Sequence, residues 1–119
     1  MVRRTELQCL YDMIYSIGLL KEYTAGKQRA DMEQHIGLQD MVCYRLQILG
    51  EAAKGVGEEL KAQYDNIPWR EMCGLRDILA HDYFGLDFDI IWDVVEHRLP
   101  PLMEQLKDIY SEQKRIENE

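Results

Sequence analysis

An arginine, a histidine and a tyrosine lie within eight residues of one another in this chain, at residues 76–83, which read RDILAHDY. A guanidinium is a permanent cation whose planar donors fit the oxygens of a phosphate. An imidazole exchanges its proton near neutral pH. These two groups can cleave a phosphodiester bond without a metal, because one holds the phosphate and the other moves protons. The segment therefore predicts a site for phosphodiester cleavage that uses Arg76 and His81.

The spacing within this segment limits what each side chain can reach if the segment is helical. Arg76 and His81 are five residues apart, which is about 140° around an ideal helix, so they do not share a face. Asp77 and His81 are four residues apart and do share one, so we expect Asp77 to orient the imidazole and raise its pKa. Two copies meeting along this helix would place both arginines and both histidines in one groove.

The rest of the chain must position this segment, and its apolar residues recur at spacings of three and four, the pattern of amphipathic helices. No segment shows the sustained alternation or the tight turns of strands. The spacing predicts four helical segments, at residues 5–23, 30–61, 69–81 and 87–110. The expected fold is an all-α, antiparallel bundle of four to five helices in a single domain that spans residues 1–119.

Glycine and proline residues divide these segments further. Gly37 is expected to break the second segment, and Gly50 to mark the close approach of another helix, because a glycine inside a helix costs roughly 1 kcal/mol relative to alanine. Asp87 is expected to cap the fourth segment, and the two prolines that follow Leu99 to kink or break it. The polar tail, residues 111–119, is expected to fray.

Composition argues against several classes of protein. No apolar run approaches the roughly 18 residues of a membrane helix, and no signal-peptide core follows the basic N-terminus, so we expect a cytoplasmic protein without a membrane partner. Cys9, Cys43 and Cys73 are at least 30 residues apart and lack metal-binding spacing, so we expect no metal site. The net charge of −8 opposes simple nucleic-acid binding, since a polyanion usually meets a basic surface. An RNA substrate would therefore need a local positive cleft.

The arrangement Arg76-x4-His81-x-Tyr83 resembles the signature of the HEPN superfamily, and specifically of its HepT-like toxins. Further landmarks of that family follow in its order and extend the resemblance over roughly residues 7–109. They are ILGEAA at 48–53, IPW at 67–69, GLR at 74–76, YFG at 83–85, IW at 91–92 and LP at 99–100.

The resemblance implies a helical bundle that forms a homodimer, with the Arg-x4-His segments of both chains at the interface cleft. It implies a metal-independent endoribonuclease that needs no cofactor and acts on RNA rather than DNA. It also implies a toxin whose partner is a nucleotidyltransferase antitoxin, which transfers AMP from ATP onto Tyr83. The family frequently has asparagine after the motif arginine, whereas this chain has Asp77, which adds negative charge to the proposed phosphate site.

These expectations lead to a hypothesis with two alternatives. In the hypothesis, His81 is the general acid or base, Arg76 stabilises charge on the phosphorane, and Asp77 fixes the imidazole. In the first alternative, the chain is a non-catalytic subunit of a nucleotidyltransferase complex, and Arg76 and His81 bind a nucleotide or the partner's substrate. The acidic composition favours this alternative. In the second alternative, the segment serves only to hold a dimer together.

Overall fold

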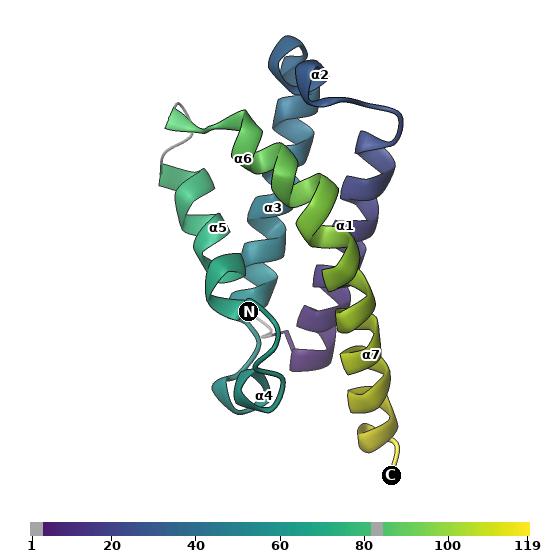
Figure 1. Ribbon diagram of the computed structural model, residues 1–119. Coiled ribbons are helices and arrows are strands. Elements are labelled where there is room, and N and C mark those ends of the chain that lie inside the picture. Colours follow the sequence, from purple (N-terminus) through teal and green to yellow (C-terminus); the bar gives the residue numbers. More distant parts are fainter. Residues whose placement is uncertain (1–3, 82–84) are drawn as a thin grey trace.

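The computed structural model describes residues 4–81 and 85–119, and within these ranges the regular structure is helical (Figure 1). This confirms the predicted all-α class. The elements are α1 (Glu6–Thr24), α2 (Arg29–Gln34), α3 (Ile36–Lys54), α4 (Glu58–Gln63), α5 (Trp69–His81), α6 (Phe88–Asp93), the π-helix η2 (Val94–Arg98) and α7 (Leu99–Glu117).

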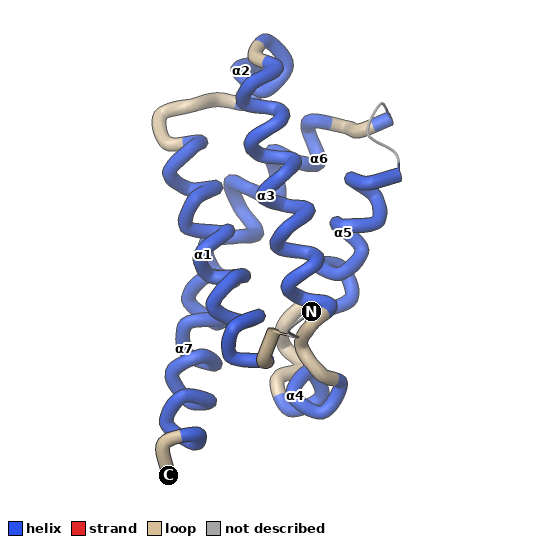
Figure 2. The backbone as a smooth tube through the Cα atoms, turned by 180° about the vertical axis from the view of Figure 1, so that it is seen from behind, coloured by secondary structure: helices blue, strands red, loops and turns tan. Residues whose placement is uncertain are grey.

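Four long columns form the bundle: α1, α3, α5 and the continuous run α6–η2–α7. Helix α3 packs against both α1 and α5, and α7 packs against α1; seen from behind, α3 lies between α1 and α5 (Figure 2). The short helices α2 and α4 lie at opposite ends of the bundle (Figure 1). They bring the number of helices above the four to five expected, because the predicted 30–61 segment is divided into three.

Helix α1 begins and ends where the sequence supplies specific groups. The hydroxyl of Thr5 accepts from the backbone N–H of Gln8, and the Gln8 side chain accepts from the Thr5 N–H, which forms a capping box. After the helix ends, Gly26 takes a φ of 72°, a conformation that favours glycine. The stripe between these ends is buried, including Leu10 and Leu20.

Gly50 allows α3 and α5 to approach closely, as its position in the middle of a helix predicted. A Cβ atom at Gly50 would lie 2.7 Å from the carbonyl oxygen of Met72 and 2.8 Å from the backbone nitrogen of Arg76. Both neighbouring atoms belong to the α5 backbone, so any side chain at this position would push the two helices apart. The glycine therefore sets the position of Arg76 against α3.

The last column is helical throughout, but its hydrogen-bond pattern changes before the prolines. Asp87 caps α6 as predicted, because its side chain accepts from the Asp89 N–H at 2.9 Å. The π-helix Val94–Arg98 then occupies the place where a kink or break was expected. Pro100 and Pro101 lie in the first turn of α7 and have no N–H, so they cannot donate the α-helical hydrogen bonds to the preceding turn.

The apolar stripe predicted for this column is buried along its whole length, from Trp92 to Ile109. The polar tail differs from the expectation, because α7 stays helical to Glu117. Arg115 forms ion pairs with Glu112 and Glu119, and the Gln113 side chain donates to the Tyr64 hydroxyl at 3.1 Å. Over the described ranges, no helix is both long enough and apolar enough to cross a membrane.

Candidate active site

Arg76 lies on the side of α5 that faces α3, and its side chain keeps 36% of its surface exposed. Its Nε lies 3.1 Å from Oε2 of Glu51 on α3, and its Nη1 donates to Oδ1 of Asp77 at 3.4 Å. A half-exposed guanidinium between two carboxylates is fixed in direction but remains within reach of a solvent-borne anion. Arg76 is therefore accessible to an anion from solvent.

Asp77 makes a different contact from the one expected. Its Oδ1 accepts from Lys54 Nζ on α3 at 2.8 Å, as well as from Arg76, whereas the sequence predicted a contact with His81. The hydrogen bond from Lys54, together with the charges of Lys54 and Arg76, holds the pKa of the Asp77 carboxyl below its ordinary value. Asp77 thus joins a cross-helix cluster of four charged groups, which we call the α3–α5 charge cluster: Glu51, Lys54, Arg76 and Asp77.

His81 is the last residue of α5 and is exposed. It lies five residues beyond Arg76, about 7 Å further along the helix axis. Tyr83, the predicted modification site, lies outside the described residues.

Lys54 is a member of the charge cluster that the sequence analysis did not single out. A usable signal exists, because Lys54 follows Gly50 by four residues and so lies on the same side of α3, the side that Gly50 opens to α5. Glu51 and Lys54 also line a hollow of 590 Å³ between α1 and the end of α3. We call this the charged hollow; Arg4 and Asp12, which form an ion pair with a distance of 2.6 Å, lie in its lining.

An exposed aromatic surface lies on α1 and α3. Tyr11 and Tyr15 stack with ring centroids 6.2 Å apart, and the Arg45 guanidinium lies over the rings of Tyr15 and Tyr44, at 5.9 and 5.4 Å. All three tyrosines are more than half exposed. We call this the tyrosine face; Tyr44 precedes Glu51 by two helical turns, so the face continues toward the charge cluster.

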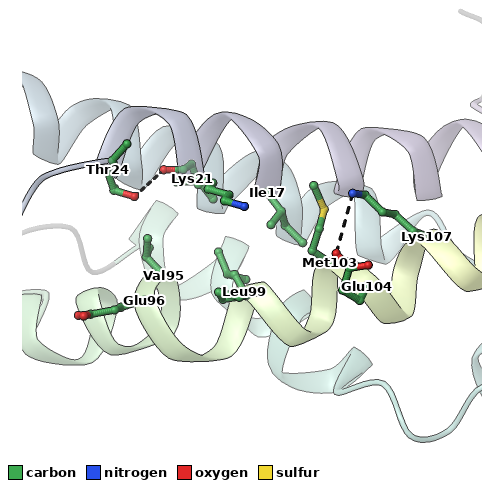
Figure 3. Close-up of a pocket in the computed structure, with 12 residues that line it drawn as sticks. Ile17, Lys21, Thr24, Val95, Glu96, Leu99, Met103, Glu104 and Lys107 are labelled. Atoms are coloured by element: carbon green, nitrogen blue, oxygen red, sulfur yellow. Dashed lines mark hydrogen bonds and ion pairs between the residues drawn. The ribbon is translucent and has the colours of Figure 1, made fainter.

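A second hollow, which we call the apolar groove, lies between α1 and the η2–α7 column (Figure 3). Its volume is 540 Å³. Ile17 of α1 points toward Leu99 and Met103 of α7, and charged side chains such as Lys107 and Glu104 lie along the edge. Of the predicted site residues that the structure describes, Arg76, Asp77 and His81, none lines it.

Cys9 and Cys43 are buried, as expected for small hydrophobic side chains. Burial raises the pKa of both thiols, that of Cys43 to about 11, so neither is suited to act as a thiolate nucleophile. No group of three or more potential metal ligands occurs among the residues whose positions the structure describes.

The fold and the site together define a small helical bundle that carries a half-exposed arginine and a terminal histidine on one helix. The family described as "Ribonuclease HepT-like" matches residues 13–109, and the chain belongs to this HepT-like family of the HEPN superfamily. The predicted resemblance is thereby confirmed.

Individual relatives agree with this assignment. A Methanocaldococcus jannaschii protein named "Gamma-glutamylcyclotransferase and putative RNase" is 38% identical over 109 residues, which are 92% of this chain but only 49% of that protein. A second protein from that organism, named "Putative RNase", is 30% identical over 90% of this chain and 98% of its own length. "Probable ribonuclease HepT" of Thermococcus cleftensis is 35% identical over 85% of this chain and 92% of its own. No solved structure gives a significant match.

Proposed function

We propose that this protein is a metal-independent endoribonuclease that cleaves RNA by attack of a ribose 2′-hydroxyl on the adjacent phosphate. One observation carries the proposal: in a chain of the HepT-like ribonuclease family, Arg76 is fixed by Glu51 and stays 36% exposed, on the helix that ends in His81. These are the two groups that the reaction needs.

The roles of the two residues follow from the chemistry. As the 2′-oxygen attacks phosphorus it loses its proton, and the departing 5′-oxygen gains one; His81 acts as general acid or base in these transfers. Arg76 stabilises the negative charge that develops on the phosphorane. The products are a 2′,3′-cyclic phosphate and a free 5′-hydroxyl. The contacts of Asp77 favour a part in holding Arg76 over a direct part in orienting the imidazole.

The proposed functional unit is a homodimer joined through the tyrosine face. Tyrosines and arginine are enriched at the centres of protein interfaces, and this face presents Tyr11, Tyr15 and Tyr44 around Arg45. Because α3 and α5 run antiparallel past Gly50 (Figure 1), α5 ends beside the first half of α3; His81 is the last residue of α5, and Tyr44 lies in that half of α3. A second copy on this face would bring another His81 into one groove and supply both an acid and a base.

We further propose that the protein is the toxin of a toxin–antitoxin pair. Its partner is a nucleotidyltransferase that transfers AMP onto Tyr83. Membership of the HepT-like family supports this proposal. Tyr83 follows His81 by two residues, so an added adenylate would bring a bulky anion beside the site, where like charge and desolvation oppose entry of an RNA phosphate.

The decisive experiment compares RNA cleavage by the wild-type protein and His81→Ala in the presence of EDTA. Wild type should produce fragments with 2′,3′-cyclic phosphate ends, and His81→Ala should lose about 100-fold or more in rate while its circular dichroism remains helical. Unchanged cleavage by His81→Ala, or a strict requirement for added metal, would contradict the mechanism.

One observation favours a second candidate, a non-catalytic subunit of a nucleotidyltransferase complex. The net charge is −8, and the cations Lys54 and Arg76 already pair with carboxylates. If a folded, unmodified wild-type protein cleaves no RNA but binds ATP or a nucleotidyltransferase, this candidate replaces the ribonuclease.

A further inference from the structure

Two cations from different helices meet at one carboxylate oxygen in the α3–α5 charge cluster. Oδ1 of Asp77 accepts from Lys54 Nζ at 2.8 Å and from Arg76 Nη1 at 3.4 Å. A phosphate oxygen held by a lysine and an arginine receives the same two kinds of charged donor. The carboxylate therefore occupies a place that suits one oxygen of a phosphate.

All three groups are accessible to solvent. The exposed fractions of the Lys54, Arg76 and Asp77 side chains are 37%, 36% and 55%. Lys54 also lines the charged hollow, so a chain that follows this surface would pass its ammonium group. An incoming phosphate can thus reach both cations without movement of either helix.

The charges within the cluster show what binding of an anion requires. Glu51 and Asp77 balance Arg76 and Lys54, so the cluster is neutral as a whole, in a chain with a net charge of −8. An RNA phosphate can gain full attraction from the two cations only if a carboxylate gives way. Asp77 is the member that contacts both cations, and it is exposed on the surface of α5.

We propose that Lys54 is a substrate-binding residue, which forms with Arg76 a two-cation site for a phosphate of single-stranded RNA, and that the Asp77 carboxylate occupies this site until RNA displaces it. The proposal rests on the proposed ribonuclease function and adds a residue to its site. It also gives Asp77, which holds Arg76 while no RNA is bound, a second role: its carboxylate weakens binding of RNA by competing with the phosphate.

The rival explanation is that Lys54 only neutralises Asp77 and never contacts RNA. A double-mutant cycle separates the two. If Lys54 is only a counterion, its removal should have no effect once Asp77 has become Asn. If Lys54 contacts phosphate, its removal should weaken binding in both backgrounds.

The test measures binding of a short, fully 2′-O-methylated single-stranded RNA, which cannot be cleaved, by fluorescence anisotropy across a range of salt concentrations. The proteins are wild type, Lys54→Met, Lys54→Arg, Asp77→Asn and the Lys54→Met/Asp77→Asn double variant. Lys107→Met serves as the matched control, because Lys107 is an exposed lysine on α7. Circular dichroism verifies that each variant is folded.

Lys54→Met should weaken binding about tenfold and lower the slope of log affinity against log salt by about 0.7, the value for one phosphate contact on a single strand. Lys54→Arg should retain the wild-type slope, Asp77→Asn should bind more tightly, and Lys107→Met should bind as wild type does. Binding by the double variant equal to that of Asp77→Asn would overturn the proposal, as would an absence of RNA binding by wild type. Because the RNA is not cleaved, this outcome is independent of the His81→Ala cleavage assay.

Discussion

The charged hollow and the apolar groove differ little in size, at 590 and 540 Å³, but they differ in what lines them. The charged hollow is lined in part by Glu51 and Lys54 of α3, which contact Arg76 and Asp77 of α5. The apolar groove is floored by core side chains of α1 and α7, including Ile17 and Leu99. The two hollows are therefore not distinguished by volume; the convergence of charged groups is what sets the candidate site apart.

The difference in lining also predicts which substitutions should change activity and which should change stability. The charge cluster consists of exposed or half-exposed groups, and exposed ion pairs contribute little to stability. The apolar side chains that line the groove, such as Ile17 and Leu99, belong to the hydrophobic core, where burial is the main stabilising contribution. We therefore expect substitutions in the cluster to change activity and substitutions in the groove to change the free energy of unfolding.

The largest expected effect is that of Arg76→Ala on RNA cleavage. Loss of a group that stabilises developing charge lowers the rate by about 100- to 1000-fold, whereas the midpoint of thermal unfolding should change little. Arg76→Lys keeps the charge without the planar pair of donors, so it should recover only part of the activity. Full activity in Arg76→Ala at unchanged stability would contradict the expectation that the charge cluster serves RNA cleavage.

Leu99→Ala should show the opposite behaviour. Leu99 is 3% exposed, and truncation of a buried leucine costs about 2–5 kcal/mol, which urea unfolding can measure. The half-buried Met103 in the same groove provides a matched control, and Met103→Ala should cost less. Cleavage per folded molecule should equal wild type for both variants. Loss of activity in folded Leu99→Ala would show that the groove is part of the active site.

Gly50→Ala should change both stability and activity, because this position joins the two regions. The added Cβ would lie within 3 Å of the Met72 and Arg76 backbone, and such overpacking costs about 1–3 kcal/mol. Displacement of α5 should also lower the cleavage rate. At Gly74, also within α5, an added Cβ would meet no atom of the other described elements within 4 Å, so Gly74→Ala should instead stabilise by about 0.5–1 kcal/mol. Equal effects of the two substitutions would show that close packing is not what Gly50 provides.

Most of the fold could be predicted from local rules in the sequence. The features that differ from the prediction depend on contacts between residues far apart in the chain. Helical spacing predicted the four columns, and Gly50 predicted a close approach, because both depend on one segment at a time. The tail was expected to fray, yet Gln113 bonds to Tyr64, 49 residues earlier. A contact at that separation cannot be derived from the composition of the tail.

The candidate site shows the same limit. The spacing of four between Asp77 and His81 correctly placed them on one helix, but it could not show that a lysine 23 residues earlier would reach Asp77 first. The partner of a charged residue depends on which sides of two helices meet. In this protein Gly50 allows α3 and α5 to pack closely. Lys54 lies one turn after Gly50 on the same side of α3, and it therefore reaches Asp77 on α5.

The smallest expected effect concerns the dependence of stability on pH, and it tests whether the Lys54–Asp77 contact persists in solution. The pKa of the Asp77 carboxyl is held below its ordinary value of 3.8, chiefly by the hydrogen bond from Lys54. Because the folded state has the lower pKa, this stabilisation is fully present above the ordinary value and is lost as the pH falls through the folded-state pKa. Asp77 is exposed, so the contribution should be small.

Urea unfolding of wild type and Asp77→Asn at pH 6 and pH 3 measures this contribution directly. Wild type should be slightly more stable than Asp77→Asn at pH 6, and the difference should shrink at pH 3, because this pH lies below the ordinary pKa of 3.8, where the stabilisation begins to be lost. Asp108→Asn, at an exposed position on α7, makes the same change in net charge and corrects for it. A difference in the free energy of unfolding that stays constant between the two pH values would mean that Asp77 does not hold Lys54 in solution. The charge cluster would then consist only of the ion pair between Arg76 and Glu51.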